Sequence, residues 1–227
     1  MIDELLTYTT HINGTDEVKQ WLSTTGKKAL KKELITASDM EHILDYLCSN
    51  AAPKRLRKMS FKDAERKAEK WSKANQKKGR NLIDKNDDIE TIHDFSDGCK
   101  IVKLKTKKAL QREGFLMSHC VGGYNPDSSD YEIYSYRDKN NIPHATFEVR
   151  RNNNEIVQIK GKGNGEIHHK YIHPILEFLR SINMEVSKNE MKYLGYYYID
   201  KDVLNSLKQY KSLNKRTTVI NGLTYAF

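Results

Sequence analysis

Three short segments with alternating apolar and polar residues constrain the fold of this chain most. They are YEIYSYR at 131–137, HATFEVR at 144–150 and EIVQIKG at 155–161. The polar connections DKNNIP and RNNN separate them. Short connections rich in Asn and Asp favour hairpins, so this region is predicted to form an antiparallel β-meander.

The alternation also predicts which side chains share a face of the sheet. Ala145, Phe147 and Val149 would face the core, and Val157 and Ile159 would do so from the next strand. The opposite face would collect the polar residues Ser135, Arg137, Thr146, Glu148, Gln158 and Lys160. Such a face is either an ordinary solvated surface or the lining of a phosphate or nucleotide pocket.

Helices are predicted on both sides of the meander. Residues 1–52 read as helical, with one short helix at Thr15–Leu22. A capping-box pattern of Ser38 and Glu41 precedes residues at helical spacing, namely Met40, Ile43, Leu44 and Leu47. A strand at 99–105, a helix at 106–115 capped by Thr106 and stopped by Gly114, and a helix at 171–186 opened by Pro174 are also expected.

The predicted fold class is therefore α+β, with a helical N-terminal region and a basic helix ahead of a small antiparallel β-meander packed by helices. Four parts are expected: residues 1–52, the basic helix and linker 53–93, the α+β core 94–186, and the tail 187–227. Residues 80–93 read as an irregular linker. In the tail, a helix near 200–211 and a hairpin turn at Asn221-Gly222 are predicted.

The net charge of +9 comes from a single segment. Residues 54–80 contain twelve basic and three acidic residues, which leaves the rest of the chain neutral. Concentrated positive charge indicates a polyanionic partner, here DNA or RNA, although a solvated helix face is the alternative. Predicted contacts are Lys54, Arg55, Arg57, Lys58, Lys62, Arg66, Lys70 and Lys73. Trp71 is read as a packing anchor for this helix rather than a base-stacking residue.

Other features argue against several classes of protein. The three cysteines, Cys48, Cys99 and Cys120, are odd in number and far apart, so neither a disulfide framework nor a four-thiolate zinc site is expected. No signal peptide or membrane-spanning stretch is recognisable. A cytoplasmic protein without cofactor, metal or membrane partner is predicted. Pro174 argues against a zinc site at His168, His169 and His173, because it places the helix start near His173.

The stretch SHCVGGY at 118–124 is the most unusual motif. His119 and Cys120 are adjacent, so they cannot form a nucleophilic dyad with each other on a strand or a helix. Gly122-Gly123 permits a tight turn. Cys120 is read as a packed thiol rather than a nucleophile, and the turn would deliver His119 and Tyr124 to a pocket. The glycine-rich GKGNGE at 161–166 lacks the spacing of a phosphate-binding loop and is read as a turn.

The motifs LQREGFLMSHCVGGY, IYSYR, HATFEV and IVQIKGKGN, in this order, resemble the C-terminal region of PcfJ-like proteins. These proteins are encoded on conjugative plasmids and phages. The resemblance covers residues 54–185, and one departure is an aromatic residue where leucine is more usual before Glu148. The matching positions are Glu113, Gly114, His119, Cys120, Val121, Gly122, Tyr124, Ser135, Arg137, Thr146, Glu148, Gln158, Gly161 and Asn164.

The resemblance implies a mobile-element protein acting around DNA transfer or phage growth, and it implies no particular reaction. Three functions follow as hypotheses. The first is a nucleic-acid-associated protein with a polar pocket. The second is an enzyme acting on a nucleotide or nucleic acid, with Glu148 as base, Arg137 as phosphate clamp and His119 as acid/base. The third is a protein-binding module that blocks a host or defence factor.

Overall fold

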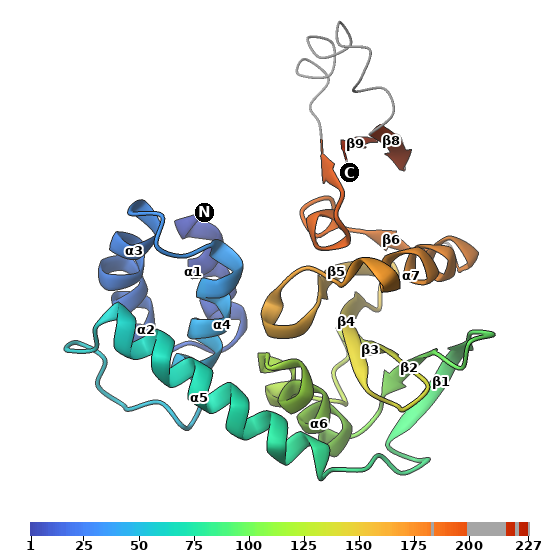
Figure 1. The fold of residues 1–227 in the computed structure, drawn as a ribbon, viewed down its shortest axis with the longest axis horizontal. Coiled ribbons are helices and arrows are strands. Elements are labelled where there is room, and N and C mark those ends of the chain that lie inside the picture. Colours follow the sequence, from blue (N-terminus) through green and yellow to red (C-terminus); the bar gives the residue numbers. More distant parts are fainter. Residues whose placement is uncertain (183, 199–216, 221–222, 227) are drawn as a thin grey trace, which may run out of the picture.

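A mixed, mostly antiparallel sheet occupies the second half of the fold (Figure 1). The computed structural model describes residues 1–182, 184–198, 217–220 and 223–226. Strands β1 to β5 pair antiparallel in sequence order, and β6 adds parallel to β5. Their bounds are β1 Ile89–Asp94, β2 Lys100–Leu104, β3 Tyr131–Arg137, β4 Pro143–Arg150, β5 Glu155–Lys160 and β6 Glu185–Val186. The α+β class and the meander are confirmed.

The helices of the N-terminal half form a bundle beside this sheet, and two later helices cover its faces (Figure 1). A π-helical turn at Leu22–Gly26 joins α2 to α3. The bounds are α1 Ile2–His11, α2 Asp16–Trp21, α3 Lys27–Lys31, α4 Ala37–Cys48, α5 Phe61–Arg80, α6 Lys107–Met117 and α7 His169–Ser181. Helix α5 begins after Ser60, whose side chain accepts a hydrogen bond from the backbone N–H of Asp63 and caps the helix.

The N-terminal bundle has its own hydrophobic core, to which α5 contributes. Leu5, Trp21, Met40 and Leu44 are among its buried side chains, joined by Ala68 from the inner face of α5. The ring of Trp71 lies beside the rings of His42 and Tyr46 on α4, at centroid distances of 6.3 and 6.1 Å. The packing role expected for Trp71 is therefore confirmed, because its ring fixes α5 against α4.

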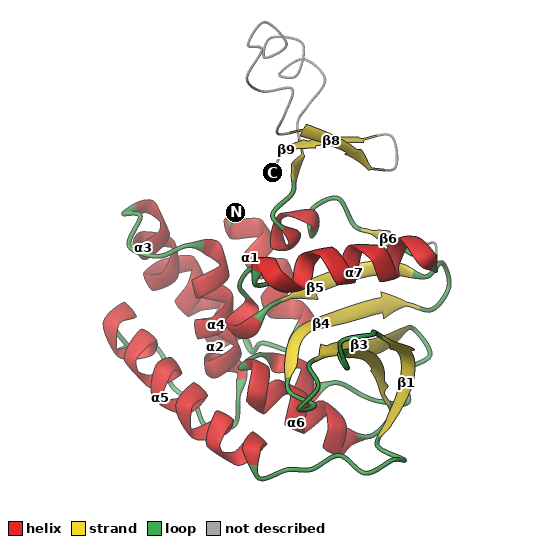
Figure 2. Cartoon of the chain, turned by 45° about the vertical axis from the view of Figure 1, so that its right-hand side comes forward, coloured by secondary structure: helices red, strands yellow, loops and turns green. Residues whose placement is uncertain are grey.

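The sheet is covered on both faces, by α7 on one and α6 on the other (Figure 2). Phe147 and Ile159 pack with Ile175 and Phe178 of α7 in the larger core. On the opposite face, Val102, Leu104 and Ile133 pack with Ala109 and Leu110 of α6. The polar residues of β4 and β5 lie on this second face, beyond the end of the apolar cluster.

Several predicted boundaries are wrong, for identifiable reasons. The cap of α4 is Thr36, whose side chain accepts from the backbone of Asp39, so the helix begins before Ser38. Strand β1 begins inside the expected linker 80–93 and ends at Asp94, one residue beyond it. Its sequence, IETIHD, has little apolar character, and it is ordered as an edge strand by pairing with β2.

Helix α6 passes through Gly114 and ends at Met117, and its C-cap Ser118 adopts the left-handed conformation at φ 59°. Gly114 is required for another reason. A Cβ atom there would lie 2.7 Å from the backbone nitrogen of Gly122, so the glycine allows the SHCVGG turn to pack directly on the helix. The prediction that Gly114 stops the helix is therefore wrong. The glycine is needed because two backbones approach closely at this position.

Helix α7 starts at His169 and contains Pro174 in its second turn, so the predicted helix 171–186 is wrong at both ends. Pro174 therefore lies inside the helix, where it cannot donate the hydrogen bond that an N–H would give to the carbonyl of Lys170. Residues 185–186 form β6 instead.

A bulge in β5 corrects one residue of the predicted core face. Gln158 pairs with Glu148, but Ile156 pairs with Val149, so Val157 is the extra residue between them. The bulge moves Val157 to the polar side, where it lines a cleft, and Ile156 takes the core position next to Ile159.

A second small sheet lies in the tail, with strands β7 Tyr197–Tyr198, β8 Thr217–Ile220 and β9 Leu223–Ala226 in the order β7-β9-β8. Ile220 pairs with Leu223, which confirms that β8 and β9 form an antiparallel pair closed by two residues. The turn residues Asn221-Gly222 and the helix predicted near 200–211 lie outside the described residues.

Candidate functional site: a polar cleft between the helical bundle and the sheet

Two rows of polar residues cross the central strands in register. Ser135, Thr146 and Lys160 lie opposite one another on β3, β4 and β5. In the adjacent row, Glu148 pairs with Ile133 on one side and Gln158 on the other. The meander therefore brings five of the six residues expected on the polar face into one patch, and the sixth, Arg137, lies at its far end.

The SHCVGG turn presses His119 onto this patch. His119 is buried, and its Nε2 lies 3.0 Å from the hydroxyl oxygen of Thr146. Thr146 donates its only hydroxyl proton to Glu113 at 2.7 Å, so its oxygen must accept from the Nε2–H of His119. Burial lowers the pKa of His119 to about 3, which keeps the ring neutral at ordinary pH.

Arg137 is held in a buried ionic network rather than in a pocket. Its guanidinium contacts Glu113 at 3.0 Å and forms a second ion pair with Asp84. Arg112 also pairs with Asp84, at 3.1 Å, and Ser135 accepts from the Nε of Arg137. Every one of these charged side chains is almost fully excluded from solvent. Arg137 therefore joins the segment after α5, helix α6 and strand β3.

A second buried cluster joins the turn to the N-terminal bundle. Asp45 of α4 accepts from the hydroxyl of Tyr8 at 2.6 Å and from the amide of Asn164 at 2.7 Å. The sulfur of Cys120 lies 3.8 Å from the same hydroxyl. Burial raises the pKa of the Cys120 thiol well above its ordinary value, and the nearby Asp45 adds to this effect. The thiol is thus kept protonated and packed.

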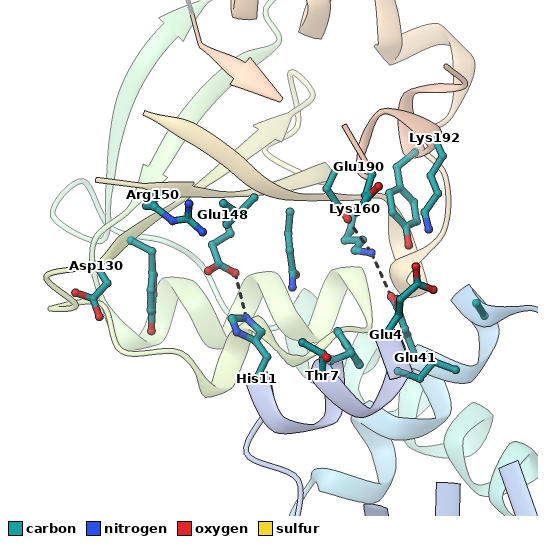
Figure 3. A pocket seen from close by; sticks show the side chains of 18 of the residues that line it. Glu4, Thr7, His11, Glu41, Asp130, Glu148, Arg150, Lys160, Glu190 and Lys192 are labelled. Carbon is teal, nitrogen blue, oxygen red and sulfur yellow. Dashed lines mark hydrogen bonds and ion pairs between the residues drawn. The ribbon is translucent and has the colours of Figure 1, made fainter. Parts of the chain in front are cut away.

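A cleft of about 750 Å³ opens between the bundle and the sheet (Figure 3). Helices α1 and α4 form one wall, and β4, β5 and the segment around Glu190 form the other. Its charged lining residues include Glu4, His11, Glu41, Asp130, Glu148, Arg150, Lys160, Glu190 and Lys192. Its size is within the range of small-molecule sites.

Three groups converge on the wall of this cleft. Nε2 of His11 lies 3.2 Å from Oε2 of Glu148 and contacts the hydroxyl of Tyr124. Tyr124 donates to the same Glu148 oxygen at 3.1 Å. The hydrogen bond to Glu148 raises the pKa of His11 against the opposing effect of burial. Burial raises the pKa of Tyr124 well above its usual value, so this hydroxyl remains a donor.

These contacts assign the protons of the His11 ring. Because the hydroxyl proton of Tyr124 goes to Glu148, the oxygens of both residues accept from Nε2–H of His11. Within the described part of the chain, Nδ1 of His11 has no hydrogen-bond partner. This nitrogen can therefore gain and lose a proton while the carboxylate holds the ring in place, which is the arrangement that a histidine acid/base requires.

Lys160 occupies the other end of the cleft floor. Its ammonium group lies 3.2 Å from Glu41 and 3.7 Å from Glu190, and it sits 3.7 Å from the ring centroid of Tyr193. Burial raises the pKa of both glutamates, and Lys160 opposes that shift. The lysine is therefore already neutralised by protein groups.

A small cavity of about 20 Å³ lies behind the cleft floor, large enough for a single water molecule. Glu148, Gln158 and Lys160 line both the cavity and the cleft. His119 and Cys120 line the cavity but not the cleft. Of the proposed catalytic residues, only Glu148 reaches the cleft, whereas His119 lies behind it and Arg137 belongs to the buried network.

Comparison with known proteins identifies the family. A family model described as PcfJ-like protein matches residues 30–175, which is more than half of the chain. The chain belongs to the PcfJ-like protein family. No curated protein matches it, and no solved structure does.

The PcfJ-like match begins within α3, so α1 lies outside it. Sequence reasoning missed the two residues that α1 supplies, Tyr8 and His11, because nothing in an exposed amphipathic helix marks a site on a distant strand. Asp45 and Asp84 were also missed, because a single acidic residue in a helix or in a connecting segment does not indicate a buried partner. Asn164 lies in the stretch IVQIKGKGN, one of the motifs that resemble PcfJ-like proteins, and this could have pointed to a buried partner.

The described residues of this PcfJ-like protein contain no group of three His, Cys, Asp or Glu side chains arranged to hold a metal ion. His169 and His173 do lie one turn apart on α7, contrary to expectation, and His173 pairs with Glu177 at 3.2 Å. In the same described residues, no helix is long and apolar enough to cross a bilayer.

Most of the cations in the basic segment of the PcfJ-like protein are exposed. Lys54, Arg55, Arg57 and Lys58 are exposed in the loop before α5. On α5, six exposed cations fall within about a quarter of the helix circumference and span roughly 27 Å. This cation stripe consists of Lys62, Arg66, Lys70, Lys73, Lys77 and Arg80.

Proposed function

We propose that this PcfJ-like protein is a nucleic-acid-associated protein of phage or plasmid origin. In this proposal the loop at 54–58 and the cation stripe of α5 bind the phosphate backbone. The observation that carries it is the stripe itself, since the face of α5 that holds Ala64 and Ala68 is buried and the cations point the other way. Contacts of this kind bind without reading sequence.

The acidic residues on α5 do not cancel the stripe. Arg66 pairs with Asp63 at 3.0 Å and Lys73 with Glu69 at 3.9 Å, and all four side chains are exposed. Exposed pairs of this type contribute about 0–1 kcal/mol, so a phosphate can replace the carboxylate at little cost. The remaining four cations of the stripe have no described ion pair.

A salt titration with a charge-reversal pair tests the proposal. The variant Lys70→Glu/Lys77→Glu alters the middle of the stripe. Lys31→Glu/Lys32→Glu makes the same change in net charge at exposed positions near the end of α3. We expect wild-type affinity for a labelled oligonucleotide to fall steeply with salt, by about 0.9 in the logarithmic slope for each phosphate contacted. The stripe variant should bind weakly with a shallower slope, and the α3 variant should resemble wild type.

Two results would reject the proposal. One is no binding of DNA or RNA at low salt. The other is equal losses in the two variants, which would attribute binding to net charge alone.

Acid–base catalysis in the cleft is a second candidate function, favoured by the contact between His11 and Glu148. A histidine held by a carboxylate at the wall of a cleft can remove a proton from a hydroxyl or a water molecule. The experiment is incubation with DNA and RNA oligonucleotides and with nucleotides, followed by mass analysis of products. Wild-type product formation that disappears in folded Glu148→Gln and His11→Gln would support it, and an unchanged yield in both variants would count against it.

A further inference from the structure

A second pocket lies at the C-terminal end of the cation stripe. It has a volume of about 490 Å³ and opens between the last turns of α5, the residues that begin β4, and the start of α7. It shares no lining residue with the cleft between the bundle and the sheet. Arg80 belongs both to the stripe and to the pocket lining, so the two surfaces are continuous.

The walls of this end pocket combine apolar and aromatic surfaces. Leu116, Ile142 and Pro143 supply the apolar part, and Ile142 is 37 % exposed. The ring of His144 stacks on that of Tyr171 with centroids 4.2 Å apart and planes 22° apart. Such walls suit a flat aromatic group, which can lie against aliphatic carbons and ring faces.

The rim of the end pocket is polar and carries positive charge. Arg80 and Lys162 are exposed there, and the ammonium of Lys162 donates to Gln76 of α5 at 3.1 Å. Glu166 is the single carboxylate among the described lining residues. Two cations around an aromatic-lined hollow match the pattern of single-stranded nucleic-acid sites, in which phosphates meet basic side chains and bases stack on rings.

We propose that the end pocket receives an unpaired base of a single-stranded nucleic acid whose phosphates lie along the cation stripe. This inference rests on the proposed nucleic-acid association and adds the form of the ligand. In a duplex the bases are paired and stacked inside, so their faces cannot enter a pocket beside the backbone. An unpaired strand can turn one base inward beside Arg80 while the adjacent phosphates remain on α5.

The test compares single-stranded and double-stranded ligands in a matched pair of variants. Ile142→Ser removes the exposed aliphatic side chain from the wall without changing the charge. Ile182→Ser is the control, because Ile182 is 41 % exposed just after α7 and does not line the end pocket. Probes are a single strand carrying the fluorescent base 2-aminopurine and the corresponding duplex. Thermal unfolding checks that both variants remain folded.

We expect wild-type protein to prefer the single strand and to change the fluorescence of the probe as its base leaves the stack. Ile142→Ser should weaken single-strand binding by about fivefold or more, because the bound base loses the exposed aliphatic side chain that it would cover. Its duplex affinity should stay within about twofold of wild type, and Ile182→Ser should match wild type for both ligands.

Two outcomes overturn the inference and are distinguishable. Equal single-strand affinity in Ile142→Ser and wild type would reject base binding in the end pocket and leave the proposed nucleic-acid association intact. Absence of binding of either ligand by wild type removes the proposed function and the inference together.

Discussion

His11 and Glu148 are joined by a 3.2 Å contact across the cleft, although 137 positions separate them in the chain. The contact fixes the end of α1 to the middle of β4. It also places a titratable ring where a ligand in the cleft would meet it. Loss of either group is therefore expected to affect both the fold and the site.

The His11–Glu148 contact predicts a pH-dependent stability. Its hydrogen bond raises the pKa of His11 above the unfolded value of about 6.5. The stabilisation should be fully present below pH 6.5 and disappear as pH rises through the folded-state pKa. His11 is 37 % exposed, so solvent screening limits the effect to about 1 kcal/mol or less.

Urea unfolding of wild type and His11→Gln at pH 5.5 and pH 8.5 measures this. The two proteins should differ more at pH 5.5. An NMR titration should also show the pKa of His11 falling in Glu148→Gln. A difference that grows with pH would contradict the assignment.

Asp45, which is buried on α4, predicts a second pH dependence of the free energy of unfolding. Burial raises its pKa to about 7, against the hydrogen bonds from Tyr8 and Asn164 that favour the ionised form. Between about pH 4 and pH 7 the folded protein retains a proton that the unfolded chain releases. The free energy of unfolding should therefore fall with rising pH, by up to about 4 kcal/mol from this group.

Asp45→Asn should flatten that part of the stability curve. Because Glu41 and Glu190 also have raised pKa values, the informative quantity is the difference between variant and wild type at each pH. An identical slope in the two proteins would show that Asp45 is ionised in the folded state throughout.

Glu113→Gln is expected to be strongly destabilising. Glu113 accepts from both Arg137 and Thr146, and neither Glu113 nor Arg137 is exposed. Removing the charge leaves the guanidinium only partly compensated, which costs about 3–5 kcal/mol in buried pairs. Glu155→Gln, which breaks an exposed pair with Arg150, should cost less than about 1 kcal/mol in denaturant unfolding. Similar losses for the two variants would contradict the importance of the network.

Gly114→Ala tests the close approach between α6 and the SHCVGG turn. Alanine is the better helix former by about 1 kcal/mol, but its Cβ would lie 2.7 Å from the backbone of Gly122 and 3.0 Å from that of His119. We expect a net loss of about 2 kcal/mol or more in denaturant unfolding, since the backbone must move. Gly123→Ala is the matched control, because a Cβ there meets no atom within 4 Å. A neutral or stabilising Gly114→Ala would refute the packing argument.

Sequence periodicity was sufficient for the meander but not for its irregularities. The alternation in residues 131–161 predicts three strands because one face is uniformly buried against α7. It cannot predict the bulge at Val157, since one extra residue leaves the composition of the strand unchanged. Strand β1 was missed because an edge strand is defined by its partner β2 rather than by its own apolar residues.

The candidate site was partly predictable for a similar reason. Thr146, Glu148, Gln158 and Lys160 share a face by local geometry, so their juxtaposition follows from strand spacing. His11 reaches Glu148 only because the N-terminal bundle packs against the sheet, and no local pattern encodes that packing. The sequence suggested that Arg137 clamps a phosphate. In the structure its guanidinium is already paired with Asp84 and Glu113, and strand spacing does not reveal these partners.

The position of α1 has a consequence for how this site can diversify. The carboxylate of Glu148 is encoded within the family region, whereas its imidazole partner comes from a helix that precedes residue 30. The side of α1 that carries Leu5 packs on the helical bundle and not on the sheet interior. Replacing the exposed residues of this one helix would therefore alter one wall of the cleft while every strand keeps its packing.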